Sequence, residues 1–127
     1  MFERPEILML ASSLAAHAAK RQRLITENVA NADTPGYAAQ DIGDFASVYR
    51  SDSDLGLRQT RPGHIADEAP PQVFRVSASG TEMSPNGNNV SLESEMVKSA
   101  ESQREHDLAI AIYGKSLDIL RASLGRR

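Results

Sequence analysis

The chain changes direction at ten residues, Asn28-Val-Ala-Asn-Ala-Asp-Thr-Pro-Gly-Tyr37. A long helical pattern precedes them. It cannot continue past Pro35, because proline lacks a backbone N–H and keeps the residue before it out of the α region. The four residues from Thr34 to Tyr37 are typical of a tight turn. Pro35 presets φ at the second position of this turn, and Gly36 supplies the positive φ that a type II turn needs at the third.

Two asparagines in this stretch, Asn28 and Asn31, lie one helical turn apart on the same face. Their side-chain amides are suited to bonding the unpaired carbonyls at the end of the helix, or a partner helix. A simple helix stop needs fewer special residues than this stretch contains. We therefore interpret it as a specific docking corner, made by Asn28, Asn31, Thr34, Pro35, Gly36 and Tyr37.

Apolar residues recur at spacings of three and four before the corner, which indicates one long amphipathic helix. Pro5 suits its first turn, and Glu6 suits its positive end. Taken to Asn31, this helix has roughly 26 residues and a length of about 39 Å. The positions of its heptad-like seam are Ile7, Leu10, Leu14, Ala18, Arg21, Ile25, Asn28 and Ala32.

A second long helix is predicted from about Ser91 to the C-terminus. Asn89 or Ser91 can cap it, and Glu93 and Glu95 lie in its first turn. Its seam consists of two interleaved rows, each with a period of seven residues, which is the pattern of a coiled coil. The first row is Met96, Gln103, Ile110, Leu117 and Leu124, and the second is Ser99, His106, Tyr113 and Leu120. We call these nine residues the C-terminal seam.

The middle of the chain, residues 38–89, shows no sustained period. Asp41 is expected to cap a short helix near residues 42–50, and residues 51–54 are expected to form a loop. Further on, Val73 to Val76 is predicted as a short strand, and Pro85-Asn86-Gly87 as a turn. The apolar face of the short helix would consist of Ile42, Phe45, Val48 and Tyr49.

These patterns predict a mainly α fold, in which long N- and C-terminal helices pair as a coiled-coil-like hairpin and an irregular or short-β segment lies between them. We divide this one structural unit into residues 1–37, 38–89 and 90–127. Aromatic residues make up only 5% of the chain, and Trp is absent. With so few large side chains to bury, we expect the isolated monomer to be marginally stable and other copies to complete its core.

Composition and charge argue against several classes of function. The net charge of -3 speaks against a nucleic-acid-binding domain, which is usually basic. The absence of Cys removes thiol catalysis and thiolate metal sites. No apolar segment approaches the ~20 residues that cross a bilayer. Residues 7–19 look like the apolar core of a signal peptide, but no positive leader precedes them, so we expect no cleavage.

The chain also lacks the patterns of an enzyme. Its three histidines, His17, His64 and His106, show no metal-ligand spacing, and each is interpreted as a packed or surface side chain. The sequence contains no isolated carboxylate pair, nucleophile elbow or phosphate-binding glycine loop. We therefore predict no catalytic residue, cofactor, metal or small-molecule substrate.

Three segments resemble the flagellar basal-body rod protein family. They are the corner with its extension Ala38-Ala-Gln-Asp-Ile-Gly-Asp-Phe-Ala46, then Arg61-Pro-Gly-His-Ile65, and finally Gly87-Asn-Asn-Val-Ser-Leu-Glu-Ser-Glu-Met96. The resemblance implies a structural subunit of the proximal rod of the bacterial flagellar basal body, in the periplasmic space. Such a subunit transmits torque, and its terminal helices line the export channel.

The same resemblance implies export through the flagellar type III apparatus without a cleaved signal. As partners it implies further copies of the chain, other rod proteins, and an adaptor protein that joins the rod to the export gate. The periodicity of the two long helices separately predicts a helix-seam interface, part of which is left over for other copies. It consists of Ile7, Leu10, Leu14, Ile25, Met96, Gln103, Ile110, Tyr113, Leu117, Leu120 and Leu124.

Helical periodicity alone is equally compatible with a soluble helical adaptor or chaperone that binds a partner through its seams. The three segments favour the rod subunit over this alternative.

Overall fold

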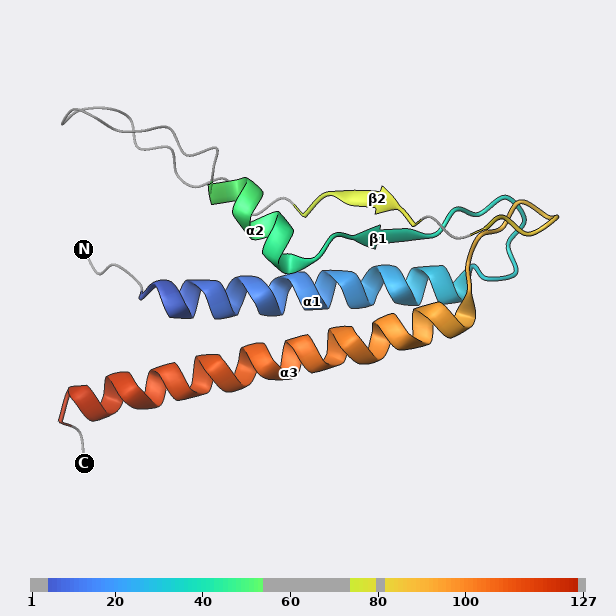
Figure 1. Cartoon of the computed structure of the whole chain (residues 1–127). Coiled ribbons are helices and arrows are strands. Elements are labelled where there is room, and N and C mark those ends of the chain that lie inside the picture. The colour runs from blue at the N-terminus through green and yellow to red at the C-terminus, as the bar shows by residue number, and fades with distance from the viewer. Residues whose placement is uncertain (1–4, 54–73, 80–81, 126–127) are drawn as a thin grey trace, which may run out of the picture.

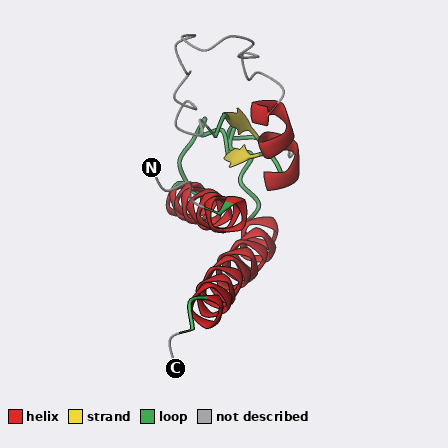
Figure 2. Ribbon diagram, turned by 90° about the vertical axis from the view of Figure 1, so that its left-hand side faces the viewer, coloured by secondary structure: helices red, strands yellow, loops and turns green. Residues whose placement is uncertain are grey.

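The fold consists of two long antiparallel helices and a small α/β layer. A computed structural model describes residues 5–53, 74–79 and 82–125. The elements follow in the order α1 (Glu6–Ala30), β1 (Gln40–Ile42), α2 (Phe45–Ser53), β2 (Val76–Ala78) and α3 (Leu92–Ser123). Helix α1 lies between α3 on one side and the layer of β1, β2 and α2 on the other (Figures 1 and 2). The predicted mainly α hairpin with a short-β middle is confirmed.

The two long helices begin and end close to the predicted residues. Helix α1 has 25 residues and follows Pro5 directly. At its other end, the Asn31 side chain donates to the Glu27 carbonyl at 2.8 Å, which also accepts from the Asn31 backbone N–H at 3.1 Å. Helix α3 has 32 residues, and its N-cap is Ser91, whose Oγ accepts from the Ser94 N–H at 3.4 Å. Of the two caps considered, Ser91 is therefore the one used.

The predictions for the middle segment were partly wrong. Asp41 does not cap a helix, because residues 40–42 are extended and form β1, which pairs antiparallel with β2 in the register Asp41↔Ser77. Helix α2 begins only at Phe45 and continues to Ser53, through most of the predicted loop. The backbone carbonyl of Asp44 accepts from the N–H groups of Ser47 and Val48 and so forms the first turn of α2.

The second strand also lies later than predicted, at Val76–Ala78 rather than at residues 73–76. Its position follows from the pairing with β1, which places Val76 opposite Ile42. Val73 lies outside the described residues, as do Arg61-Pro-Gly-His-Ile65 and His64 within it.

The apolar core is small and lies between α1 and the α/β layer. Leu24, Ile42 and Phe74 are buried together, and Val48 packs against them. His17 is 0% exposed, and its Nε2 donates to the Gly43 carbonyl at 2.9 Å. The His17 ring also meets the rings of Phe45 and Phe74 edge-on, so its interpretation as a packed histidine is confirmed.

The helices do not pair through the first row of the predicted C-terminal seam. The buried positions of α3 are Glu95, Ser102, Ala109 and Ser116, which precede the first row of that seam by one residue each. One residue corresponds to a rotation of about 100° around a helix. Met96, Ile110 and Leu124 are accordingly 71%, 56% and 81% exposed. Small side chains allow the close approach of the two backbones, and Ser102 Oγ donates to the Ala18 carbonyl of α1 at 2.8 Å.

On α1 the predicted seam is correct only in its second half. Ala18, Arg21, Ile25 and Asn28 are buried, as expected. Ile7 and Leu10 are 50% and 39% exposed, and Leu14 is half-buried. The pair is therefore well buried near the corner and poorly buried near the chain termini, which lie at the opposite end (Figure 1).

Candidate assembly site: a polar corner and an exposed helix face

The corner, residues 28–37, has the predicted turn geometry. The Tyr37 N–H donates to the Thr34 carbonyl at 3.3 Å and closes the turn. Gly36 has a φ of +73°, so the predicted positive φ is confirmed. The remaining N–H at the tip, that of Gly36, donates to the Asn86 carbonyl at 3.1 Å. The corner is thus docked against residues fifty positions further along the chain.

A second glycine turn, residues 84–87, forms the other side of this contact. The Gly87 N–H donates to the Ser84 carbonyl at 2.8 Å, and Gly87 has a φ of +80°. A Cβ at Gly87 would lie only 3.4 Å from the Gly36 Cα. The predicted turn at Pro85-Asn86-Gly87 is confirmed, and its glycine is needed both for its φ and for the close approach of the corner.

Asn88 follows the second turn and caps the end of α1 from a distance. It is 3% exposed, and its Nδ2 lies 2.9, 2.9 and 2.8 Å from the carbonyl oxygens of Asn31, Ala32 and Thr34. These carbonyls lie just beyond the last turn of α1, where the helix itself offers no donor. The neighbouring Asn89 binds the α/β layer, since its Oδ1 accepts from the Ala39 N–H at 2.6 Å.

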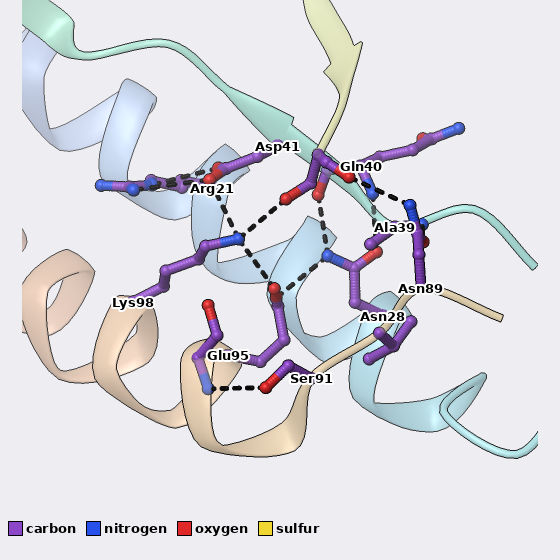
Figure 3. Close-up of polar contacts among 12 residues, drawn as sticks. Arg21, Asn28, Ala39, Gln40, Asp41, Asn89, Ser91, Glu95 and Lys98 are labelled. Atoms are coloured by element: carbon purple, nitrogen blue, oxygen red, sulfur yellow. Dashed lines mark hydrogen bonds and ion pairs between the residues drawn. The ribbon is translucent and has the colours of Figure 1, made fainter. Parts of the chain in front are cut away.

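Asn28 joins α1 to both neighbouring layers. It is 0% exposed, and its Nδ2 donates to the Gln40 carbonyl at 2.8 Å and to Glu95 Oε2 at 3.0 Å. Its Oδ1 accepts from the Gln40 N–H at 3.0 Å and from the Tyr37 hydroxyl at 3.2 Å. Every donor and acceptor of this buried amide is therefore used, as Figure 3 shows for the contacts with Gln40 and Glu95.

Through its bond to Glu95, the Asn28 amide contacts a compact cluster of charged side chains (Figure 3). Glu95 Oε1 pairs with Lys98 Nζ at 2.8 Å, and Lys98 Nζ also lies 3.5 Å from Asp41 Oδ2. Arg21 Nε donates to Asp41 Oδ1 at 3.1 Å. Two cations and two anions thus face one another, so the burial of each charge is compensated. We call Arg21, Asn28, Asp41, Glu95 and Lys98 the polar hub.

The hub favours the ionised form of its central carboxylate. Burial alone would raise the pKa of Asp41. The hydrogen bonds from Arg21 and from the Ile42 N–H, together with the positive charges of Arg21 and Lys98, outweigh this effect and hold the pKa below its ordinary value of 3.8. Asp41 therefore stabilises the fold while it is ionised.

We predict that the variant Asp41→Asn is less stable than the parent chain at neutral pH, by about 1–3 kcal/mol, the usual scale for hydrogen bonds to charged groups. Because the folded-state pKa is depressed, the contribution of Asp41 is present above the ordinary value of 3.8 and is lost as the pH falls through the lower folded-state value. Urea unfolding of both chains should show the difference narrowing as the pH is lowered to about 3.

The matched control is Asp118→Asn. Asp118 has two cationic partners on its own helix, but its side chain is 60% exposed. The control should change stability by less than about 1 kcal/mol at either pH. A difference between Asp41→Asn and the parent that does not depend on pH would contradict the prediction.

Large apolar side chains remain exposed on both long helices. On α1 they are Ile7, Met9, Leu10 and Val29, and on α3 they are Leu92, Met96, Val97, Leu108, Ile110, Tyr113, Ile119 and Leu124. Gln103 is exposed, whereas Leu117 and Leu120 are half-buried. The first row of the C-terminal seam thus lies along one flank of α3. A groove between the helices adjoins this row and includes two seam residues, Gln103 and His106. It is lined by Ala18, Ala19, Gln22, Ser102, Gln103 and His106.

Comparison with known proteins shows which family this chain resembles. Residues 8–37 match the family described as flagella basal body rod protein. The chain is 32% identical over 108 residues to the flagellar basal body rod protein FlgB of Agrobacterium fabrum, with 81% of each chain covered. It is 33% identical over 105 residues to FlgB of Bacillus subtilis, covering 82% of this chain and 81% of the relative. With FlgB of Salmonella typhimurium the identity is 33% over 109 residues, covering 78% of each.

The chain belongs to the FlgB family of flagellar basal body rod proteins. The resemblance inferred from the three segments is thereby confirmed, and so is a structural role in the rod of the basal body. Membership of the FlgB family also supports association with other rod components. It is a family of structural proteins rather than of enzymes.

Two structural observations accompany this assignment. Among the described residues, no helix is both long enough and apolar enough to cross a bilayer. Within the same ranges, no three His, Cys, Asp or Glu side chains come together in a way that would hold a metal ion.

Sequence reasoning missed several residues that build this site. Asn88 appeared only as part of a resembling segment, although two adjacent asparagines between a glycine turn and a helix were a signal for side-chain capping. Glu95 was interpreted as an acid in the first turn of the second helix. It is 2% exposed and pairs with Lys98, so this ion pair belongs to the interior.

Proposed function

We propose that this chain forms part of the proximal rod, where it transmits torque and contributes its two long helices to the wall of the export channel. The observation that carries this proposal is that different kinds of residue cover the inner and outer faces of the two long helices. Small and polar residues hold α1 to α3, whereas large apolar residues such as Met96 and Ile110 lie on the outside. A lone monomer gains nothing from exposing them, whereas burial against a neighbour is favourable.

The geometry of such an assembly follows from the shape of the subunit. We infer that the contact with a neighbour joins different surfaces of the two copies, as a repeating rod requires. Interfaces of this kind generate helical arrays rather than closed dimers. Interlocked helices then give the array the stiffness that torque transmission requires.

The wider setting of the subunit is part of the same proposal. We infer that the chain is exported without cleavage of a signal peptide and reaches the periplasmic part of the basal body. Its partners there would be further copies, other rod proteins, and the adaptor that joins the rod to the export gate. The family relationship supports association with other rod components in general. It does not favour a soluble adaptor or chaperone.

Cysteine cross-linking in basal bodies tests the proposed contact, because the native chain contains no Cys. We expect Ile110→Cys, on the exposed flank, to cross-link to a neighbouring subunit in basal bodies isolated from a strain that carries only this variant. Glu101→Cys is the matched control, because nine residues on α3 correspond to half a turn and Glu101 is also exposed. Efficient cross-linking through position 101 but not 110 would show that the wrong flank has been assigned.

A further inference from the structure

The contacts that hold α3 to α1 are unevenly distributed along the helices. Near the corner, Glu95 bonds Asn28, Ser99 bonds Gln22 at 2.9 Å, and Ser102 bonds the Ala18 carbonyl. Beyond Ser102 the buried residues of α3 are only Ala109 and Ser116. The Ser116 hydroxyl donates to the Ile112 carbonyl of its own helix, so it makes no bond to α1.

Few contacts therefore hold the two helices together in the half that lies nearer the chain termini. Its buried side chains, Ala11, Ala109 and Ser116, are small, so each contributes little apolar burial. The helices also cross at an angle, with their ends at the corner closer together than their ends at the termini (Figures 1 and 2). The larger residues of this half, such as Leu14, Leu117 and Leu120, are only half-buried, so their packing constrains the crossing angle weakly. The direction of α3 is therefore set mainly near its beginning.

We propose that Glu95 is the positioning residue that sets the angle of α3 relative to α1. Its two carboxylate oxygens have different partners, one being the Asn28 amide of α1 and the other Lys98 on the next turn of α3. Lys98 in turn reaches Asp41 of β1, so the first turns of α3 are attached at two separate points. These two attachments lie at the start of α3, ahead of the bonds made by Ser99 and Ser102, and together they hold its first turn in one direction.

A small change of angle at this point is amplified along the helix. With 32 residues, α3 is about 48 Å long, so a rotation of about 5° about its first turn moves its far end by about 4 Å. The exposed residues Ile110 and Leu124 would move with it. The functional meaning of this inference rests on the proposed function. In an assembled rod, the angle of α3 would decide where the C-terminal seam meets a neighbour.

The test measures distances between spin labels in the purified full-length chain. One label pair, at Arg23 and Val97, reports on the helices close to the corner, and a second, at Ser12 and Ala111, reports on them nearer the termini. All four positions are exposed. Ala111 lies about 28 Å along α3, so a rotation of about 5° moves it by about 2.5 Å. In Glu95→Ala we expect the distribution of the second distance to broaden by about 2.5 Å, while that of the first keeps its width and helicity is unchanged.

Two further variants distinguish positioning from a general loss of stability. Glu95→Gln keeps an acceptor for the Asn28 amide, and we expect it to restore most of the parental width. Asp118→Ala removes an acid that also pairs with cations on α3 but is exposed, and it should leave both distances unchanged.

Three results would overturn the proposal. They are an unchanged far distance in Glu95→Ala, equal broadening of both distances with loss of helicity, and a far distance that is already broad in the parent chain. Because the measurement is made on the isolated chain, its failure is separate from that of the proposed function, which is tested by cross-linking in basal bodies.

Discussion

Replacing Gly36 by valine is expected to destabilise the folded chain by about 1–3 kcal/mol and to abolish its incorporation into the rod. Gly36 has a φ of +73°, a conformation that a β-branched residue resists. A Cβ at this position would meet nothing within 4 Å, so the cost is conformational and not steric. Urea unfolding of the purified chain and swimming of a strain that carries only the variant measure the two effects.

Gly36→Asn is the matched control for this prediction. Asparagine tolerates a positive φ better than other residues with a side chain, and there is space for it. We expect Gly36→Asn to retain most of the stability and of the swimming. Normal swimming of the valine variant would show that assembly does not need this backbone conformation.

The second large effect is expected from placing a charge on the exposed flank of α3. Ile110→Asp should leave the isolated chain folded, because the side chain is 56% exposed in the monomer. It should nevertheless block incorporation, since burying an unpaired carboxylate in an interface costs several kcal/mol, which corresponds to at least about a hundredfold loss of affinity. The half-buried Leu117 and Leu120 lie on the same seam, and Asp at either position should also block incorporation.

Leu108→Asp provides the control for the effect of a charge at an equally exposed site. Leu108 is 55% exposed, and the two residues that separate it from Ile110 correspond to a rotation of about 200° around the helix. Copurification of each variant with intact basal bodies is the measurement. If Ile110→Asp copurifies as well as the parent chain, the C-terminal seam is not the contact surface.

The seven-residue pattern of α3 illustrates what can be predicted from this sequence. Periodicity identifies the helix and its length, because apolar spacing reflects one face of a helix whatever that face contacts. It does not tell whether the contact is within the chain or with another chain. Here the buried positions Glu95, Ser102, Ala109 and Ser116 are polar or small, so the apolar pattern identifies the neighbouring flank instead.

The corner was predictable for a different reason. The conformational limits of Pro35 and Gly36 are local, and local rules suffice to predict a turn there. What docks against the turn is determined by residues distant in sequence. The adjacent asparagines at 88 and 89 are a local signal for capping but do not say what they cap, and Glu95 has no local peculiarity that would indicate burial. Only the three-dimensional arrangement brings Asn88 to Asn31 and Glu95 to Asn28. Likewise, Asp41 is a residue type that often caps a helix, but here it lies in a strand opposite Ser77 and its carboxylate binds Arg21.

The side chain of Asn88 also has a consequence for the order in which the chain folds. The carbonyls of Asn31, Ala32 and Thr34, just after α1, accept from a residue more than fifty positions downstream. A chain that emerges N-terminus first therefore cannot complete these bonds until the segment containing Asn88 has followed. Contacts between residues so far apart in sequence form slowly compared with local ones. We therefore expect the corner to close late in folding.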